Sequence, residues 1–264
     1  MFGTNEIVGQ KYFSDAPKDS LMITSMFFTV QGEGPYMGQP AYFFRLSKCN
    51  LNCSFCDAFF DKGEYYTHQE LLEKMESEVP DYFKGNGLIV LTGGEPCLQD
   101  IGPFISFLMD RGYHTQIETN GILLTFQRCN FATVVCSPKC SEKTGKYLNL
   151  SDGSKSMIDA LKFVVSADPK SPYHRIPDWA LEWKEKYGGK IYLSPMNEYE
   201  RLPSKARGTG NLEERSTKDE IISFWETGML DMKANQANHE WAGKYALEIG
   251  ANLNIQMHLL VSMA

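Results

Sequence analysis

The sequence predicts an α/β fold in which parallel strands and helices alternate to form a full or partial (β/α) barrel. Apolar, β-branched stretches alternate along the chain with segments of helical periodicity, as in parallel βαβ units wound with one hand. The length of 264 residues is close to the ~250 residues of a complete barrel. We expect one ordered domain over residues 1–264, because 42% of the residues are apolar and 22% are charged.

Short apolar and β-branched runs mark the expected strands, and longer segments of helical period mark the helices between them. The strands are expected at Ser25–Val30, Ala41–Leu46, Leu88–Thr92, His114–Glu118, Thr133–Ser137, Ala160–Ser166, Lys190–Ser194 and Leu253–His258. The helices are expected at His68–Glu78, Asp100–Arg111, Pro177–Tyr187, Lys218–Gly228 and Ala234–Ile249. The stretch Glu198–Lys218 is charged and poor in apolar residues, which predicts an exposed loop. We therefore expect residues 197–250 to form an inserted loop and helical region before the last strand.

Composition argues against several classes of protein. The net charge of −7 and the pI near 5.3 argue against a nucleic-acid partner, because non-specific binding requires a basic face. No apolar run approaches the ~20 residues of a membrane-spanning helix, so no membrane partner is expected. Residues 1–15 lack a basic-then-apolar signal pattern, and seven cysteines, an odd number, suit a disulfide framework poorly. We therefore expect a cytoplasmic protein.

Three of the cysteines, Cys49, Cys53 and Cys56, lie within eight residues of one another. They follow the expected strand Ala41–Leu46, and α/β folds place their chemistry at this carboxyl end of a strand. A structural zinc site needs a fourth ligand, for which His68 is a candidate. A four-iron cluster held by three thiolates leaves one iron open to a substrate or cofactor. The spacing alone leaves zinc, plain buried thiols and an iron–sulfur cluster open.

Polar motifs also follow other expected strands. Thr92–Pro96 contains a glycine pair that lets a ligand approach the backbone closely, although an ordinary turn has the same composition. Glu118–Gly121 and Ser137–Lys139 end the next two strands. These motifs indicate a site at one edge of the sheet.

Arg45 interrupts an otherwise apolar strand, Tyr42–Leu46. A buried arginine without a counter-charge is costly, so the sequence predicts an anion beside it. The residues leave two sources open: a bound anionic ligand, or an internal salt bridge to Glu33 or Asp57.

The spacing Cys-x3-Cys-x2-Cys after a barrel strand resembles that of radical S-adenosylmethionine (SAM) enzymes. In that superfamily three cysteines hold a [4Fe–4S] cluster whose open iron binds SAM, and reductive cleavage yields a 5′-deoxyadenosyl radical. Further motifs resemble one family within it, the 7-carboxy-7-deazaguanine synthases. In chain order these motifs are Gln31–Gly34, Gly38–Pro40, Phe44–Leu46, the cysteine triplet with Asp57, Leu91–Cys97, Gln116–Gly121, Ser137–Lys139 and Asn254–His258. The resemblance is weak over Cys140–Lys190 and Glu198–Ala251.

The resemblance implies a partial (β/α) TIM-like radical SAM barrel with helical insertions. It implies a lyase that converts 6-carboxy-5,6,7,8-tetrahydropterin to 7-carboxy-7-deazaguanine with loss of ammonia, in the biosynthesis of 7-deazapurines such as queuosine. The implied cofactors are a [4Fe–4S] cluster and SAM, and the implied partners are a flavodoxin-like one-electron reductant and a second copy of the chain. Two alternatives stay open: a radical SAM activase that installs a glycyl radical on a partner enzyme, and a zinc-stabilised binding protein.

The same resemblance assigns roles to individual residues, and it implies no side-chain radical. The implied cluster ligands are Cys49, Cys53 and Cys56. The residues implied at SAM are Phe55, Asp57, Gly93, Gly94, Glu95, Glu118, Asn120, Ser137, Pro138, Lys139, Ser194, Pro195, Met196 and Asn197. The residues implied at the substrate are Val30, Gln31, Gly32, Glu33, Arg45, Thr92, Gln256, His258 and Ala264, the last through its terminal carboxylate.

For three of these roles, the residue type or its place in the sequence gives a more specific expectation. Glu95 is expected to be either a charge partner for the amino group of SAM or a conformational brace. Gln256 and His258 alternate on the expected last strand, so they point to one face. The family comparison favours the substrate carboxylate as the partner of Arg45.

The chain departs from the family pattern at two positions. Ala58 stands where family members commonly carry a threonine or serine, whose hydroxyl helps to bind Mg²⁺. Mg²⁺ prefers oxygen ligands and keeps several waters, so here it is held through substrate and water near Asp57, or it is dispensable. Ser194 precedes Pro195 where the family has glutamine, and its hydroxyl has a shorter reach.

Overall fold

The structure, a computed structural model of the chain, describes residues 6–53, 56, 58, 60–129, 131–141, 143–198 and 230–260. The expected helix Lys218–Gly228 and nearly all of the expected loop Glu198–Lys218 lie outside these residues, as do Phe55, Asp57 and Ala264. His258 is described by its backbone. None of the described helices is both long enough and apolar enough to cross a membrane.

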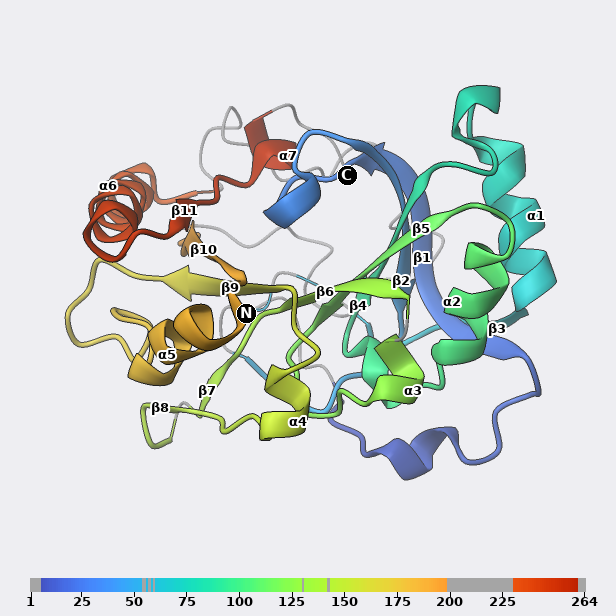
Figure 1. Cartoon of the computed structure of the whole chain (residues 1–264), viewed down its shortest axis with the longest axis horizontal. Helices are drawn as coiled ribbons and strands as arrows, with labels where there is room; N and C mark the ends of the chain where they lie inside the picture. The colour runs from blue at the N-terminus through green and yellow to red at the C-terminus, as the bar shows by residue number, and fades with distance from the viewer. Residues whose placement is uncertain are drawn as a thin grey trace.

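The described residues contain one nine-stranded sheet that curls into a partial barrel (Figure 1). Its strands lie in the order β11-β10-β9-β6-β5-β4-β2-β1-β3, parallel from β11 to β2, with β1 antiparallel to both β2 and β3. The strands are β1 (Ser20–Val30), β2 (Pro40–Leu46), β3 (Glu64–Thr67), β4 (Leu88–Gly93), β5 (His114–Thr119), β6 (Ala132–Cys136), β9 (Ala160–Val165), β10 (Lys190–Pro195) and β11 (Asn252–Leu253). A separate small hairpin consists of β7 (Cys140–Ser141) and β8 (Lys146–Tyr147).

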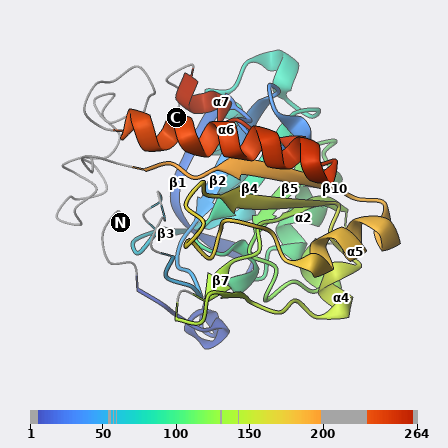
Figure 2. The same ribbon diagram turned by 90° about the vertical axis from the view of Figure 1, so that its left-hand side faces the viewer.

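The longer helices cover the outer side of the curled sheet (Figure 1), and α6 runs alongside β10 (Figure 2). The α-helices are α1 (His68–Glu78), α2 (Gly102–Met109), α3 (Phe126–Cys129), α4 (Asp152–Lys155), α5 (Asp178–Tyr187), α6 (Met232–Ile249) and α7 (Met257–Leu260). The short 3-10 helices are η1 (Gln10–Phe13), η2 (Gly34–Tyr36), η3 (Asp81–Phe83) and η4 (Pro96–Leu98). The four long predicted helices within the described residues are confirmed as α1, α2, α5 and α6, each within two residues of its expected ends.

The predicted parallel arrangement is wrong for β1. The chain passes from β1 to β2 through residues 31–39, which is shorter than the crossover of about a dozen residues that a parallel pair requires. The two strands therefore pair antiparallel, with Phe27 opposite Phe43 and Val30 opposite Pro40. β1 also starts at Ser20 instead of Ser25, and its added residues pair with β3, which was not predicted.

The predicted last strand, Leu253–His258, is also wrong. β11 ends at Leu253, and after residues 254–256 the chain forms α7. Directly after the strand, the side chain of Asn254 binds two other elements: Oδ1 accepts from Gly34 N at 2.7 Å, and Nδ2 donates to Ser194 Oγ at 2.8 Å. Gln256 and His258 therefore do not alternate along a strand.

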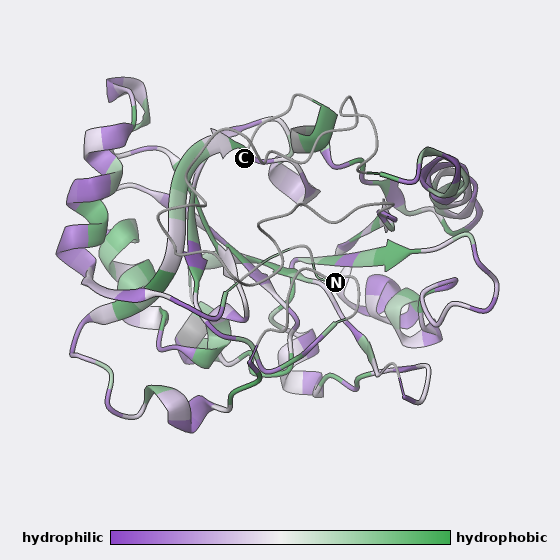
Figure 3. Ribbon diagram, turned by 180° about the vertical axis from the view of Figure 1, so that it is seen from behind, coloured by the Kyte–Doolittle hydropathy of each residue, from purple (hydrophilic) through white to green (hydrophobic). Residues whose placement is uncertain are grey.

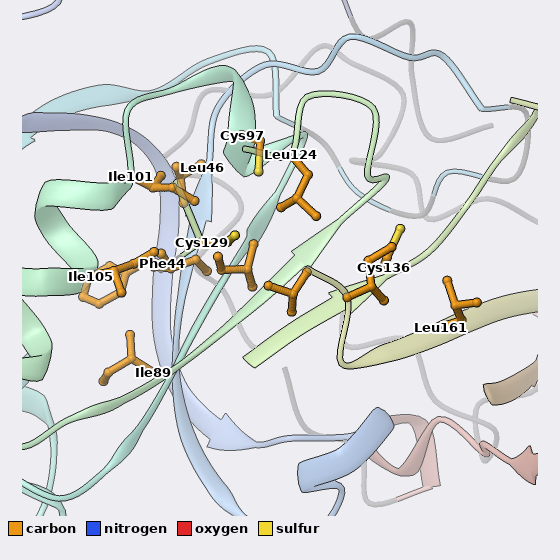
Figure 4. Packing of buried hydrophobic residues seen from close by; sticks show 14 of the residues in the cluster. Phe44, Leu46, Ile89, Cys97, Ile101, Ile105, Leu124, Cys129, Cys136 and Leu161 are labelled. Carbon is orange, nitrogen blue, oxygen red and sulfur yellow. The ribbon is translucent and has the colours of Figure 1, made fainter. Parts of the chain in front are cut away.

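The main apolar core lies between the sheet and its helices. Figure 3 shows apolar colour along the strands and polar colour on the outward sides of the helices. In Figure 4, Ile101 lies beside Leu46 of β2 and Ile105 of α2 lies beside Phe44 of β2, and these residues and Ile89 of β4 are fully buried. This packing fixes the positions of β2 and β4, whose carboxyl ends carry the site.

The inner face of the sheet changes from apolar to polar along its strands. Side chains alternate between faces, so Leu88 and Val90 of β4 share a face with Thr92, and Ala41 of β2 shares one with Arg45. The apolar members of this set form a small buried cluster, whereas Arg45 and Thr92 line a cavity. The fold thus gathers polar side chains at the carboxyl ends of the strands.

Candidate active site

A cavity of about 330 Å³ lies at the carboxyl ends of the parallel strands, where α/β barrels place their chemistry. The three cysteines of the triplet line this cavity. Every residue predicted at SAM or substrate whose side chain the structure describes also lines it, except Pro138. The fold therefore brings residues from the whole length of the chain to one place. The described lining residues that were predicted are Val30, Gln31, Gly32, Glu33, Arg45, Cys49, Cys53, Cys56, Thr92, Gly93, Gly94, Glu95, Glu118, Asn120, Ser137, Lys139, Ser194, Pro195, Met196, Asn197 and Gln256.

The cysteine loop, residues 47–60, leaves β2 at the wall of this cavity. Leu51 N donates to Cys49 Sγ at 3.4 Å, and Cys56 N donates to Cys53 O at 3.2 Å. Burial raises the pKa of the Cys49 thiol to about 12, and the neighbouring Cys53 and Cys56 add to the rise. A metal must therefore displace the proton of this thiol when it binds the sulfur.

Gly93 and Gly94 hold the cysteine loop against the end of β4. A Cβ at Gly93 would collide with the backbone of Leu46, and a Cβ at Gly94 would collide with the carbonyl of Lys48. Gly94 N donates to Leu46 O at 3.0 Å, and Glu95 N donates to Lys48 O at 2.9 Å. The glycine pair therefore allows two backbone segments to approach each other closely. This explains why glycine is needed here even without a bound ligand.

A segment before β1 supports the same loop. The sequence did not predict a role for this segment. Val8 N donates to Cys49 O at 3.0 Å. The ammonium of Lys48, whose side chain is almost fully buried, lies 2.7 Å from Glu6 Oε2 and over the ring of Tyr12. Burial lowers the pKa of Lys48, but the bond to Glu6 and the charges of Tyr12, Glu6 and Asp61 together raise it by more, so the ammonium stays charged.

Glu95 is a fully buried carboxylate that connects the ends of β4 and β5. Its Oε1 accepts from Cys97 N at 2.9 Å and from Thr119 Oγ1 at 2.7 Å. Its Oε2 accepts from Asn120 N at 2.7 Å. Burial raises its pKa, and these three donors act in the opposite direction. The contacts are those of the conformational brace, one of the two predicted roles.

Asn120, Ser137 and Lys139 end the next two strands, and each has a partner within the chain. Asn120 Nδ2 donates to Asn50 Oδ1 at 2.8 Å, which connects β5 to the cysteine loop. Its Oδ1 accepts from Ile122 N at 3.1 Å in an Asx-type turn. Lys139 Nζ donates to Ser137 Oγ at 2.7 Å. These residues shape the wall of the cavity between β5 and β6.

The loop from Gln31 to Gly34 forms the opposite wall. Gln31 is buried, and its Oε1 accepts from Glu33 N at 3.1 Å. Its Nε2 is buried without a hydrogen-bond partner among the described residues. An orphaned buried donor is costly, and a ligand acceptor in the cavity would satisfy it.

The segment after β11 packs onto this loop from outside. Met257 N donates to Gly32 O at 3.1 Å, and Asn254 bonds to Gly34 N as described above. Asn197 Nδ2 donates to Gln256 Oε1, so the end of β10 and the C-terminal segment meet at the cavity. The C-terminal segment therefore covers the cavity although the predicted strand is absent.

Arg45 and two aromatic rings form a further part of the lining. Phe27 and Phe43 stack in parallel with ring centroids 5.3 Å apart, and both line the cavity. The guanidinium carbon of Arg45 lies 5.9 Å from the centroid of Phe27. The Arg45 cation beside these flat aromatic rings forms a site that suits a planar ligand carrying a negative charge. The sequence did not predict these two phenylalanines at the site. The available signal was that each of them alternates with polar residues along its strand.

Lys162 is the most polar lining residue that sequence reasoning missed. It lies in β9 and is almost fully buried. Its Nζ is 2.6 Å from Glu33 Oε2 and 2.7 Å from Glu118 Oε2. A single lysine within the apolar run Ala160–Val165 was the available signal, of the same kind as Arg45.

His68, the candidate fourth zinc ligand, lies elsewhere. It is the first residue of α1, and its ring packs against Phe104 and Phe107 with centroids 5.1 and 5.9 Å away. Burial lowers its pKa. His68 is not among the residues that line the cavity, and its ring is part of the helix packing.

The donor set fits a cluster and SAM better than it fits Mg²⁺. Three thiols of one loop face a cavity that also receives the glycine pair after β4 and polar side chains after β5 and β6. The carbonyl of Ala58 accepts from Cys56 Sγ at 3.5 Å, and the Ala58 side chain carries no oxygen for a hard cation. The chemistry of these donors suits the cluster and SAM, although the described residues do not hold three ligands at metal-binding positions, and position 58 offers Mg²⁺ no side-chain ligand.

Comparisons with known proteins agree with this geometry. Residues 45–141 match the Radical SAM superfamily. The 7-carboxy-7-deazaguanine synthase of Rhodospirillum rubrum is 38% identical over 220 residues, which are 79% of this chain and 87% of that protein. The enzyme of the same name from Rickettsia prowazekii is 31% identical over 258 residues, 94% of each chain. The crystal structure of QueE from Escherichia coli has the same fold, with a TM-score of 0.59 and 20% identity over 95% of this chain and 99% of that one.

A partial barrel with a three-cysteine loop at the carboxyl end of its strands defines a radical SAM protein, which uses a [4Fe–4S] cluster and SAM. Within that superfamily the chain belongs to the 7-carboxy-7-deazaguanine synthase family.

Proposed function

We propose that this chain is a carbon–nitrogen lyase that converts 6-carboxy-5,6,7,8-tetrahydropterin to 7-carboxy-7-deazaguanine with loss of ammonia. The observation that carries the proposal is that one cavity joins the cysteine loop to Arg45 and the Gln31–Gly34 loop. A cluster site and an anion site in one small cavity suit a small carboxylated substrate. The family membership supports the same reaction.

The substrate is a planar heterocycle that carries a carboxylate, and the lining offers a partner to each part. Arg45 pairs with the carboxylate, and the rings of Phe27 and Phe43 pack beside the heterocycle. The orphaned Nε2 of Gln31 donates to a ring acceptor, and Glu33 accepts from ring N–H groups. Thr92, Gln256, His258 and Ala264 complete the substrate site.

The cofactors, when bound, supply the 5′-deoxyadenosyl radical that takes a hydrogen atom from the substrate carbon that carries the carboxylate. The chain positions the substrate so that this hydrogen is the one within reach. Glu95 keeps the ends of β4 and β5 in register, and Asn120 holds the cysteine loop to β5. The C-terminal segment excludes water from the cavity by packing on Gly32 and Gly34.

The SAM site is formed by the cysteine loop and by residues at the strand ends that line the cavity. The cluster ligands are Cys49, Cys53 and Cys56. Gly93 and Gly94 bind SAM through their backbone, and polar groups after β5, β6 and β10 bind its ribose and amino acid parts. The residues in these roles are Phe55, Asp57, Glu118, Asn120, Ser137, Pro138, Lys139, Ser194, Pro195, Met196 and Asn197.

Several partners belong to the same proposal. Because Ala58 offers no side-chain oxygen, Mg²⁺ would either be held through substrate and water near Asp57 or be dispensable. A flavodoxin-like protein delivers the electron in the cytoplasm, a reducing compartment that suits seven free cysteines. The chain forms one domain and associates as a homodimer, for which the exposed Leu247 of α6 and Leu253 of β11 offer apolar surface.

Anaerobic incubation with carboxytetrahydropterin, SAM and a reductant, followed by mass analysis, tests the proposal. We expect 7-carboxy-7-deazaguanine to form in amounts that exceed the enzyme. Cleavage of SAM without this product would contradict the proposal and favour an activase. Zinc without iron in anaerobically purified protein would instead favour a binding protein.

A further inference from the structure

Lys162 stands at the centre of a buried group of charges that spans three elements of the fold. Its ammonium contacts Glu33, from the loop after β1, and Glu118, near the end of β5, at 2.6 and 2.7 Å. Glu118 Oε1 also accepts from Gln116 Nε2 at 2.6 Å. A buried ammonium is costly unless it is paired, and here it has two carboxylate partners.

The group carries a net negative charge, since two carboxylates face one ammonium. Burial lowers the pKa of Lys162, but its two carboxylate partners raise it by more, so the amine is charged. The pKa of Glu118 is raised, because burial and the charge of Glu33 outweigh the opposing effects of the Lys162 ammonium and the bond from Gln116. Without Lys162 the two carboxylates would repel each other in a buried site and would not hold their present positions.

The three residues line the same cavity as Arg45 but lie on another part of its wall. Arg45 is on β2, and Lys162 is on β9, with β4, β5 and β6 between them in the sheet. The cavity thus has a cationic side and a side with net negative charge. A ligand with a carboxylate at one end and N–H donors at the other matches this arrangement.

We propose that Lys162 is a positioning residue of the substrate site, which is anchored on Glu118 and holds Glu33 so that the Glu33 carboxylate accepts from the N–H groups of the aminopyrimidine half of the pterin. The inference rests on the proposed function and deepens it. The Lys162 ammonium acts through the Glu33 carboxylate and does not itself bind the ligand. Its loss weakens binding of the pterin and leaves binding of SAM nearly unchanged.

Equilibrium binding to the cluster-loaded enzyme tests this role, with 6-carboxypterin, a fluorescent oxidised analogue, and SAM as the two probes. For Lys162→Met we expect the dissociation constant of 6-carboxypterin to rise at least tenfold and that of SAM to change less than threefold. Lys190→Met is the matched control, because Lys190 is exposed at the amino end of β10, and it should leave both constants unchanged.

A second variant separates positioning from charge balance. Lys162→Met combined with Glu118→Gln keeps one net negative charge, so this protein remains informative if Lys162→Met alone fails to fold. We expect it to bind 6-carboxypterin at least fivefold more weakly than Glu118→Gln alone, because Glu33 has lost its ammonium partner. Equal affinity of the two proteins would show that Glu33 binds the pterin equally well without its ammonium partner, and would overturn the proposal.

Two further results would also overturn it: wild-type affinity for 6-carboxypterin in Lys162→Met, or equal losses for the pterin and SAM. Failure of the proposed function has a different signature. In that case the wild-type enzyme itself neither binds 6-carboxypterin nor forms the deazaguanine product. A wild-type enzyme that forms product while Lys162→Met binds the pterin normally refutes only the role of Lys162.

Discussion

Replacement of Glu95 by glutamine tests the brace between β4 and β5. The two side chains have the same shape, but the carboxylate accepts three hydrogen bonds, from Cys97 N, Thr119 Oγ1 and Asn120 N. A glutamine can place its one oxygen where Oε1 lies and keep two of these bonds. Its NH₂ group then faces the backbone N–H of Asn120, which loses its acceptor.

The expected cost follows from these contacts. A buried N–H without an acceptor costs about 1–3 kcal/mol, and the two remaining bonds each lose about 1 kcal/mol when the acceptor is no longer charged. Relief from burying a carboxylate offsets part of this sum. We expect Glu95→Gln to lower the free energy of unfolding by about 2–4 kcal/mol, which lowers the melting temperature by roughly 4–16 °C in a chain of this size.

Thermal unfolding under anaerobic conditions measures this loss, and SAM binding is measured on the same samples. Glu73→Gln is the matched control, because Glu73 lies on the exposed face of α1 and its partner is Gln69. It should shift the free energy by no more than about 0.5 kcal/mol. If Glu95→Gln melts like the wild type but binds SAM weakly, Glu95 is a direct partner of SAM and the brace is refuted.

Three further predictions concern the substrate, acid stability and the metal. Arg45→Met should raise the dissociation constant of 6-carboxypterin about 10- to 100-fold, the worth of a charge-assisted hydrogen bond, with little change for SAM; comparable losses for both ligands would exclude a carboxylate role. Burial lowers the pKa of His68 in the folded state, so protons bind the unfolded state more readily, and stability should fall as the pH drops below about 6.5. Melting curves of His68→Phe between pH 5 and 7 should show a smaller dependence on pH than the wild type, and an identical dependence would refute this cause. Ala58→Thr should lower the Mg²⁺ concentration that gives half-maximal turnover, whereas wild-type turnover that is indifferent to a chelator would show that the ion has no role.

Local patterns account for what the sequence predicted well. The helices were recognisable because their apolar residues recur with helical period, and α1 is one example, with Leu71, Leu72 and Met75 buried on one side. The site residues were recognisable because each polar motif follows an apolar strand. In a parallel sheet such positions meet at one edge, and the family resemblance identified which motifs to group.

Contacts between distant segments account for what it predicted poorly. Lys162 pairs with Glu33 across 129 residues, and Asn254, directly after the last strand, accepts from Gly34 N across 220 residues. Neither partner is visible from the sequence around the residue itself. Arg45 and Lys162 nevertheless share one signal, a lone cation in an apolar strand.

Iron analysis combined with electron paramagnetic resonance tests the central claim most directly, namely that Cys49, Cys53 and Cys56 hold a cluster with one iron left open. For protein reconstituted and reduced without oxygen, we expect about four irons per chain and a cluster signal that changes when SAM is added. A cluster signal indifferent to SAM, or a protein that takes up zinc and no iron, would contradict the account.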